Sequence, residues 1–283
     1  MRILLTGRNG QVGWELERKL APLGEVIATD RATLDLADPD AIRRVVRETK
    51  PDVIVNAAAY TAVDKAESEP ELAMKINGFA PGVLAEEAKR LGALLVHYST
   101  DYVFDGDKTT PYVEDDPPNP INVYGRTKLE GERAIQAAGC RHLILRTSWV
   151  YGARGRNFLL TILRLAREQQ ELRVVDDQVG APTTSALIAC VSGEILSKNP
   201  DAHGIYHFAA SGKTSWCGFA REILAASGNS TRVLAIPSSE FPAPARRPRN
   251  SLLDCAKLAR ECQIVQGPWQ EGLQATLRQL QDG

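Results

Sequence analysis

The sequence has almost no net charge and no long hydrophobic run. Its 34 Lys and Arg residues nearly balance its 35 Asp and Glu residues, so the formal charge of the 283-residue chain is −1. This balance argues against a nucleic-acid partner, which selects for basic surfaces. The apolar run at residues 3–6 is too short for a signal peptide. We therefore expect a cytoplasmic protein that binds neither membranes nor nucleic acid.

Cysteines are few, and their pattern is uninformative for metals or disulfides. The five cysteines are odd in number and contain no Cys-x-x-Cys pair. Paired disulfides and zinc sites both have characteristic even sets and short spacings. We therefore expect reduced cysteines that pack in the interior of the protein.

A glycine-rich turn near the N-terminus is the first positive signal. The apolar run 2–6 leads into Gly7, Gly10 and Gly13, and residues 14–23 then follow with helical spacing. Such a strand, glycine turn and helix let the backbone approach a pyrophosphate at a helix N-terminus. The order of elements predicts dinucleotide binding.

The next strand, predicted at residues 25–29, ends in Asp30. A carboxylate at this place is suited to hydrogen-bond the adenosine ribose, which favours NADH. Arg8 and Arg31 are cations that suit a 2′-phosphate, which favours NADPH. The sequence leaves the choice between NADH and NADPH open. Asp35 either lines the adenine pocket, together with Leu36, or is a solvated loop acid.

Strands and helices alternate through the first half of the chain. We predict strands at 52–55, 93–98 and 142–146, helices at 39–49 and 69–91, and a long proline-rich loop at 105–122. This alternation is typical of an α/β fold with a Rossmann-type, doubly wound parallel sheet. We expect a dinucleotide-binding domain at 1–148, rejoined by part of 172–197, and a mainly substrate-binding, smaller mixed α/β lobe at 149–283. Residues 204–208 and the helices predicted at 215–226 and 269–280 are assigned to that lobe.

Tyr124 and Lys128 stand four residues apart in a predicted helix at 123–136. Residues at this spacing lie on one helix face. A fixed positive charge near a phenol favours its phenolate and makes the tyrosine a usable general acid. The pair alone is a weak signal, because Tyr-x-x-x-Lys also arises by chance. Thr100 follows the strand predicted at 93–98. Its hydroxyl is therefore expected on the same side of the sheet as the glycine turn.

Together these motifs resemble the extended short-chain dehydrogenase/reductases and, within them, the dTDP-4-dehydrorhamnose reductases. The resemblance is carried by segments that span nearly the whole chain, namely 63–67, 99–104, 123–128, 146–151, 177–183 and 246–251. It implies reduction of the C4 ketone of dTDP-4-dehydro-L-rhamnose by NADPH or NADH. It also implies roles for individual residues.

Tyr124 would donate a proton to the nascent alkoxide, Lys128 would lower its pKa and hold the nicotinamide ribose, and Thr100 would polarise the carbonyl. The positions that match cofactor-binding residues are Gly7, Gly10, Gln11, Val12, Gly13, Asp30, Arg31, Asp35, Leu36, Ala59, Tyr60 and Thr61, with Tyr124 and Lys128. The positions that match substrate-binding residues are Thr100, Asp101, Tyr102, Trp149 and Asn157. The cluster 246–249 either binds the substrate pyrophosphate or is an exposed basic turn.

Some members of this family form a homodimer around a magnesium ion held by glutamates. Glu15 matches one of these ligands, but Ser185 stands where another is expected. This departure argues against a metal.

Other functions remain open at this stage. A dehydratase would need a carboxylate pair after Thr100, and Asp101 is followed by Tyr102. A different nucleotide-4-ketosugar reductase would need only a reshaped pocket. A non-catalytic NAD(P)-binding regulatory subunit is also known in this family, and the intact Thr100, Tyr124 and Lys128 argue against it.

Overall fold

The computed structural model describes residues 1–282 and is built around one six-stranded parallel sheet. Its strand order is β10-β5-β4-β3-β1-β2, with every neighbouring pair parallel. The strands are β1 (Arg2–Thr6), β2 (Glu25–Thr29), β3 (Val53–Asn56), β4 (Leu94–Thr100), β5 (His142–Thr147) and β10 (Gly204–His207). The prediction of a Rossmann-type doubly wound sheet is confirmed. The topological switch point, where such folds bind ligands, lies between β1 and β3.

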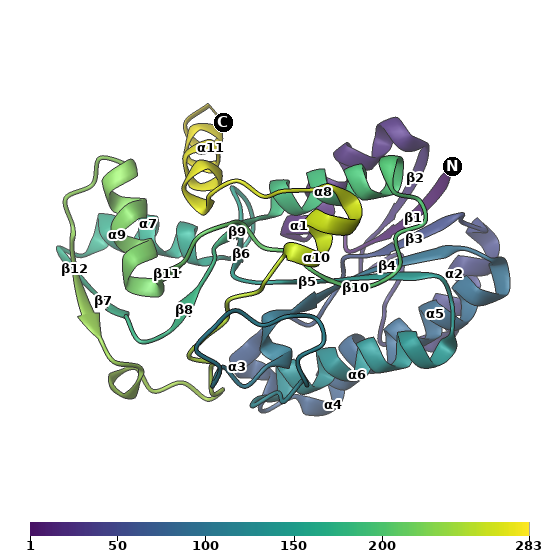
Figure 1. Cartoon of the computed structure of the whole chain (residues 1–283), viewed down its shortest axis with the longest axis horizontal. Helices are drawn as coiled ribbons and strands as arrows, with labels where there is room; N and C mark the ends of the chain where they lie inside the picture. Colours follow the sequence, from purple (N-terminus) through teal and green to yellow (C-terminus); the bar gives the residue numbers. More distant parts are fainter. Residues whose placement is uncertain (283) are drawn as a thin grey trace.

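Helices cover both faces of the sheet (Figure 1). One layer contains α1 (Gln11–Leu20), α8 (Ser185–Lys198) and α10 (Ala256–Cys262); the other contains α2 (Pro39–Thr49), α5 (Ala80–Leu91) and α6 (Val123–Ala138). Side chains alternate along each strand, so Ile3 and Leu5 of β1 pack towards the first layer while Leu4 packs towards the second. Both faces are apolar, as a parallel sheet that is buried on both sides requires.

Local capping sets the ends of the helices that matter for the site. Asn122 accepts a hydrogen bond from the backbone of Gly125 at the start of α6, and Gly139 ends the helix in a left-handed conformation. An Asn before a helix and a Gly after it satisfy the backbone groups that helix ends leave unpaired. The helix predicted at 123–136 is therefore present and two residues longer.

The helix predicted at 69–91 is interrupted. It consists of α4 (Pro70–Met74), one π-turn (η2, Lys75–Phe79) and α5. The π-turn turns Asn77 into the protein, where its side chain is buried. Side-chain periodicity over this stretch did not reveal the extra residue in the turn.

A smaller lobe lies beyond one end of the sheet, on the left of Figure 1. It contains α7 (Phe158–Glu168), α9 (Trp216–Ala226), α11 (Trp269–Asp282) and a parallel pair formed by β7 (Glu171–Val175) and β12 (Arg232–Ile236). Its own apolar core includes Leu159, Phe219 and Leu273. The short elements are η1 (Ala21–Leu23), α3 (Val63–Ala66), η3 (Asp101–Val103), β6 (Val150–Tyr151), β8 (Val179–Gly180), β9 (Thr183–Thr184), β11 (Thr214–Ser215) and η4 (Ser238–Glu240).

The chain passes between the two parts more often than the sequence suggested. Residues 204–208 were assigned to the smaller lobe, but β10 pairs with β5 as the sixth strand of the large sheet. Within 172–197, α8 packs in the layer of α1, whereas β7 pairs with β12 in the smaller lobe. A strand of only four residues carries no local sign of which sheet it joins. No helix within residues 1–282 is long and apolar enough to cross a membrane.

Candidate active site

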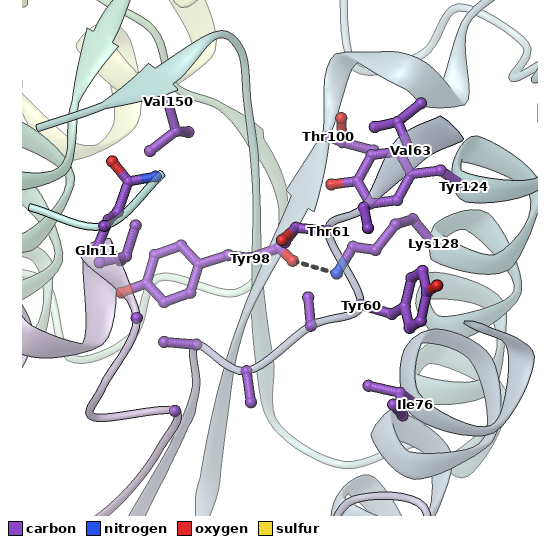
Figure 2. A pocket seen from close by; sticks show the side chains of 18 of the residues that line it. Gln11, Tyr60, Thr61, Val63, Ile76, Tyr98, Thr100, Tyr124, Lys128 and Val150 are labelled. Atoms are coloured by element: carbon purple, nitrogen blue, oxygen red, sulfur yellow. Dashed lines mark hydrogen bonds between the residues drawn. The ribbon is translucent and has the colours of Figure 1, made fainter. Parts of the chain in front are cut away.

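A cavity of about 820 Å³ opens at the carboxyl ends of β1, β3 and β4. Its lining includes the glycine turn, the loop after β3, the end of β4, the start of α6 and two tryptophans of the 149–216 segment. This is the edge of the sheet at which doubly wound folds bind dinucleotides. Figure 2 shows part of the lining, with Gln11 and Tyr98 on one side and Tyr124 and Lys128 on the other.

The glycine turn has the geometry of a phosphate-binding loop. Gly7 has φ of +76°, and a Cβ there would lie 2.8 Å from the backbone nitrogen of Ala58. Gly10 precedes α1 without any side-chain cap, so the helix N-terminus faces the cavity with its backbone N–H groups. Of the residues predicted to bind the cofactor, Gly7, Gly10, Gln11 and Val12 line the cavity, whereas Gly13 packs on the turn itself. The residues present fit a dinucleotide.

The predicted adenosine end is also on the cavity wall, where Asp30, Arg31, Asp35 and Leu36 are all found. Hydrogen bonds from Thr33, and then from Ala32 and Asn9, hold the pKa of Asp30 below its usual value. Its carboxylate is therefore available as an acceptor. The Arg31 guanidinium lies 3.6 Å from Asp35. Arg8 pairs with Glu17 at 2.7 Å and does not line the cavity, so Arg31 is the better placed cation for a 2′-phosphate.

The loop after β3 contributes Ala59, Tyr60 and Thr61 to the cavity. Asn77 fixes this loop, because its side chain accepts from the Tyr60 backbone N–H at 2.8 Å and donates to the Tyr60 carbonyl at 3.0 Å. The same amide donates to the Thr127 hydroxyl on α6 at 3.2 Å. Asn77 therefore joins the loop to the helix of Tyr124. Sequence reasoning missed it, although an Asn-Gly pair inside a helical stretch is a sign of interruption.

Thr100, Asp101 and Tyr124 meet at the inner end of the cavity. The Thr100 hydroxyl donates to the Asp101 carboxylate at 2.9 Å, and the Tyr102 ring packs edge-on against the Tyr124 ring at 5.7 Å. Burial raises the pKa of Tyr124 to about 12, with the Asp101 charge adding to the increase and a hydrogen bond with Thr100 opposing it. Burial likewise raises the pKa of Asp101 to about 6. A tyrosine in this environment holds its proton at neutral pH.

Lys128 lies one turn along from Tyr124, but its ammonium contacts other groups (Figure 2). Its Nζ donates to the Tyr98 carbonyl at 2.6 Å and lies 3.1 Å from His97 Nε2. Burial lowers the pKa of Lys128 to about 8, and the Glu132 charge opposes this effect. The sequence predicted that Lys128 would lower the pKa of Tyr124. Here that pKa is raised, because desolvation of the phenol and the Asp101 charge dominate.

Two tryptophans form the opposite wall. The Trp149 and Trp216 rings stack with centroids 3.5 Å apart and planes 4° apart, and both line the cavity. Trp149 has φ of +48°, and its ring packs on Gly180, where any Cβ would lie 2.4 Å from it. Trp149 was predicted from the sequence. Trp216 was not, because only the tertiary fold brings α9 next to residue 149.

Asn157 and the cluster 246–249 are not part of the cavity lining. Asn157 caps α7 by accepting from the Leu160 backbone at 3.0 Å, and it donates to the Gln11 side chain at 2.8 Å. It therefore supports a cavity residue without forming the wall. In the cluster 246–249, Arg247 is paired with Asp64 at 2.8 Å, while Arg246 and Arg249 are exposed.

Glu15 does not belong to a cluster of metal ligands. Its charged neighbours are Arg18, Lys19 and Arg154, and burial raises its pKa. Ser185 is buried beside Gly152. Among residues 1–282, no group of three or more His, Cys, Asp or Glu side chains could hold a metal ion. A divalent cation prefers several oxygen ligands of negative charge, so this donor set does not fit magnesium within one chain.

Comparison with known proteins gives a consistent result. The family model described as the RmlD substrate binding domain matches residues 1–282. The dTDP-4-dehydrorhamnose reductase of Burkholderia thailandensis is 48% identical, with 99% of each chain covered. A crystal structure of a dTDP-4-dehydrorhamnose reductase from Clostridium acetobutylicum has a TM-score of 0.96 and 41% identity, covering 99% of this chain and 100% of that one. The Bacillus anthracis enzyme, solved in complex with NADP, has a TM-score of 0.94 and 37% identity, covering 98% and 99%. The chain belongs to the family of dTDP-4-dehydrorhamnose reductases.

Proposed function

We propose that this protein reduces the C4 ketone of dTDP-4-dehydro-L-rhamnose to dTDP-L-rhamnose with NADPH or NADH. The observation that carries the proposal is that Thr100, Tyr124 and Lys128 line the same cavity as the glycine turn of Gly7 and Gly10. The names of relatives at 48% and 47% identity support the substrate. The NADP in the Bacillus anthracis relative and the cavity position of Arg31 support NADPH as the preferred cofactor.

The cofactor supplies a hydride to C4 when it is bound. Tyr124 then gives its phenolic proton to the oxygen that becomes negative. The raised pKa of Tyr124 keeps that proton in place until a stronger base, the C4 alkoxide, is formed. General acids match their task when they are protonated at the working pH and placed at the reacting oxygen.

Thr100 and Lys128 assist at the same point. The Thr100 hydroxyl lies next to Tyr124 at the end of β4; its single hydrogen faces Asp101 in this structure and would turn to the carbonyl when the substrate binds. Such a donor stabilises the charge that develops on the oxygen. Lys128 offers a positive charge one helical turn from Tyr124, which favours the phenolate after the proton has left. Trp149 and Trp216 provide a flat apolar surface for the nucleotide sugar.

The test is oxidation of NADPH and of NADH by the purified protein with dTDP-4-dehydro-L-rhamnose. We expect turnover with the ketosugar and none with dTDP-glucose, which has no ketone at C4. NMR of the product identifies the configuration at C4. The opposite configuration would favour a different nucleotide-4-ketosugar reductase. Tight cofactor binding without turnover would favour a regulatory subunit.

Two further expectations concern assembly and location. We propose a homodimer, as in some members of the family, and a cytoplasmic location, where reduced nicotinamide cofactors and nucleotide sugars are available. Light scattering coupled to size-exclusion chromatography gives the mass of the protein in solution. The mass of a single chain at micromolar concentration would contradict the dimer. Cell fractionation checks the location.

A further inference from the structure

The buried ammonium of Lys128 has more hydrogen-bonding partners than its proposed role requires. An ammonium carries three N–H donors. One reaches the Tyr98 carbonyl at 2.6 Å, and Nζ also lies 3.1 Å from His97 Nε2. The side chain is 2% exposed and lines the cavity. The two contacts on β4 leave one N–H for the cavity side.

His97 is itself held by the neighbouring strands. Its ring is 1% exposed in the middle of β4, and its Nδ1 lies 3.0 Å from the side-chain nitrogen of Asn56 at the end of β3. The Asn56 oxygen accepts from the Thr6 hydroxyl at the end of β1 at 2.7 Å. A row of buried hydrogen bonds thus runs across three adjacent strands, from the ends of β1 and β3 to the middle of β4, and stops at Lys128. Each member limits the rotation of the next.

The protonation states within this row depend on one another. Burial, followed by the Lys128 charge, holds the pKa of His97 well below its usual value, so the ring is neutral and has one donor and one acceptor. A charged Lys128 can only donate, so Nε2 must accept and Nδ1–H must face the Asn56 oxygen, which requires the Asn56 amide to be turned from the orientation described above. An uncharged Lys128 can accept from Nε2–H, with the Asn56 nitrogen donating to Nδ1. Half-rotation of the Asn56 amide exchanges the two arrangements.

The Tyr98 carbonyl lacks this adaptability, because it only accepts. The other titratable or charged groups near Lys128 are Tyr124 and Glu132 on its own helix and Asp101 beside Tyr124. Glu132 is already paired with Arg146 at 2.7 Å. His97 is thus a partner on the facing strand that suits either form of the lysine.

We propose that His97 is a positioning residue for Lys128, and that its Nε2 sets where the ammonium sits and stabilises its charged form during the reaction. This inference rests on the proposed function for its catalytic consequence. The contact between the two side chains is independent of that function. His97 does not need to touch the substrate.

Two substitutions of similar polarity separate the positioning role from a packing role. In glutamine the amide lies three bonds beyond Cβ, as Nε2 does, so His97→Gln keeps an acceptor for Lys128. In asparagine it lies two bonds beyond Cβ, as Nδ1 does, so His97→Asn keeps only the contact with Asn56. We expect His97→Asn to lower kcat about tenfold to a hundredfold with little change in KM, and His97→Gln to retain kcat within about threefold.

The pH profile gives a readout that a packing role would not change. Loss of an acceptor disfavours the charged lysine, so the alkaline limb of the kcat profile should move to lower pH in His97→Asn and stay in place in His97→Gln. Equal loss of kcat in both variants with an unmoved limb would overturn the proposal. So would wild-type kcat in His97→Asn.

A second measurement covers the case in which these variants fold poorly. The chain has four histidines, so their ring nitrogens can be assigned by NMR in the intact protein and in Lys128→Met. We expect the ring shifts of His97 to change while those of His142, His203 and His207 stay the same. Unchanged His97 shifts would refute the contact. Failure of the wild type to reduce the ketosugar would refute the proposed function alone.

Discussion

The two walls of the cavity differ in how they are held. One wall is formed by Thr100, Tyr124 and Lys128; because we propose that these residues act in the reaction, we call it the catalytic wall. Thr100 and Lys128 are buried and Tyr124 is half-buried, and directional hydrogen bonds tie the wall to its surroundings. The aromatic wall, formed by Trp149 and Trp216, is held by ring stacking and by close packing on Gly180. Proton transfer requires atoms at fixed distances, whereas apolar contact tolerates small displacements. We therefore expect the first wall to control rate and the second to control affinity.

The largest expected effect is on the catalytic wall. Tyr124→Phe removes the proton donor and keeps the ring, so kcat should fall roughly 10²- to 10⁴-fold with cofactor affinity nearly unchanged. Steady-state kinetics and fluorescence titration of NADPH check this. Tyr206→Phe is the control, because the Tyr206 hydroxyl donates to Glu261 at 2.9 Å outside the cavity. A Tyr124→Phe enzyme with normal kcat would remove Tyr124 from the reaction.

Substitutions in the aromatic wall should mainly change KM for the nucleotide sugar. Trp216→Ala removes one of the two stacked rings, and we expect KM for the nucleotide sugar to rise about fivefold to tenfold while kcat changes little. Trp14→Ala is the control, because Trp14 packs against Arg18 outside the cavity. A fall in kcat with unchanged KM would contradict the division between the walls.

Asp101, which is hydrogen-bonded to Thr100 of the catalytic wall, should have a cost in stability that depends on pH. Asp101 is 3% exposed and its pKa is raised from 3.8 to about 6, so the folded protein binds this proton more tightly than the unfolded chain. The stability that the Asp101 proton contributes is fully present below pH 4 and is lost as the pH rises through 6. Asp101→Asn should therefore be about 2–3 kcal/mol more stable than wild type at pH 8, with little difference at pH 4. Urea unfolding at both pH values measures this, with the exposed Asp201→Asn as control.

A smaller effect is expected at the far end of the cavity, away from both walls. Asp30→Ala removes the acceptor suited to the adenosine ribose, so KM for NADH should rise several-fold more than KM for NADPH. The two cofactors serve as controls for each other. Equal weakening would mean that the carboxylate does not contact the ribose.

Removal of divalent metal ions is expected to have no effect on turnover. Neither wall contains a set of metal ligands, and Glu15 has cationic neighbours. Turnover should therefore survive EDTA. Loss of activity that magnesium restores would show that a metal is required.

The sequence predicted what local spacing determines. The glycine turn, Asp30 and the Tyr124 to Lys128 pair each lie within one strand-turn-helix unit or one helix, so their placement follows from periodicity. The aromatic wall was half predicted, since Trp149 follows a strand end but Trp216 reaches it only through tertiary packing. Asn157 was predicted to bind substrate; in the structure it caps α7 and does not line the cavity, and an Asn before a helical run is an ordinary signal for such a cap.

The buried partners were not predictable in the same way. His97 and Asn56 sit in apolar strands, and only the pairing of β3 with β4 at Asn56 and His97 makes them neighbours. The net direction of the Tyr124 pKa was not predictable from the spacing to Lys128, because desolvation depends on how much of the protein surrounds the phenol. Motifs specify which groups are present, and the tertiary fold specifies their environment.

The π-turn at 75–79 makes the site sensitive to chain length. Removing one residue there, for example the 62% exposed Phe79, would let the stretch form an ordinary α-helical turn. The wider turn that directs the buried Asn77 side chain towards the loop after β3 would then be lost. A single-codon deletion on the surface of the molecule would thus separate the cofactor loop from the catalytic helix without changing any residue that lines the cavity.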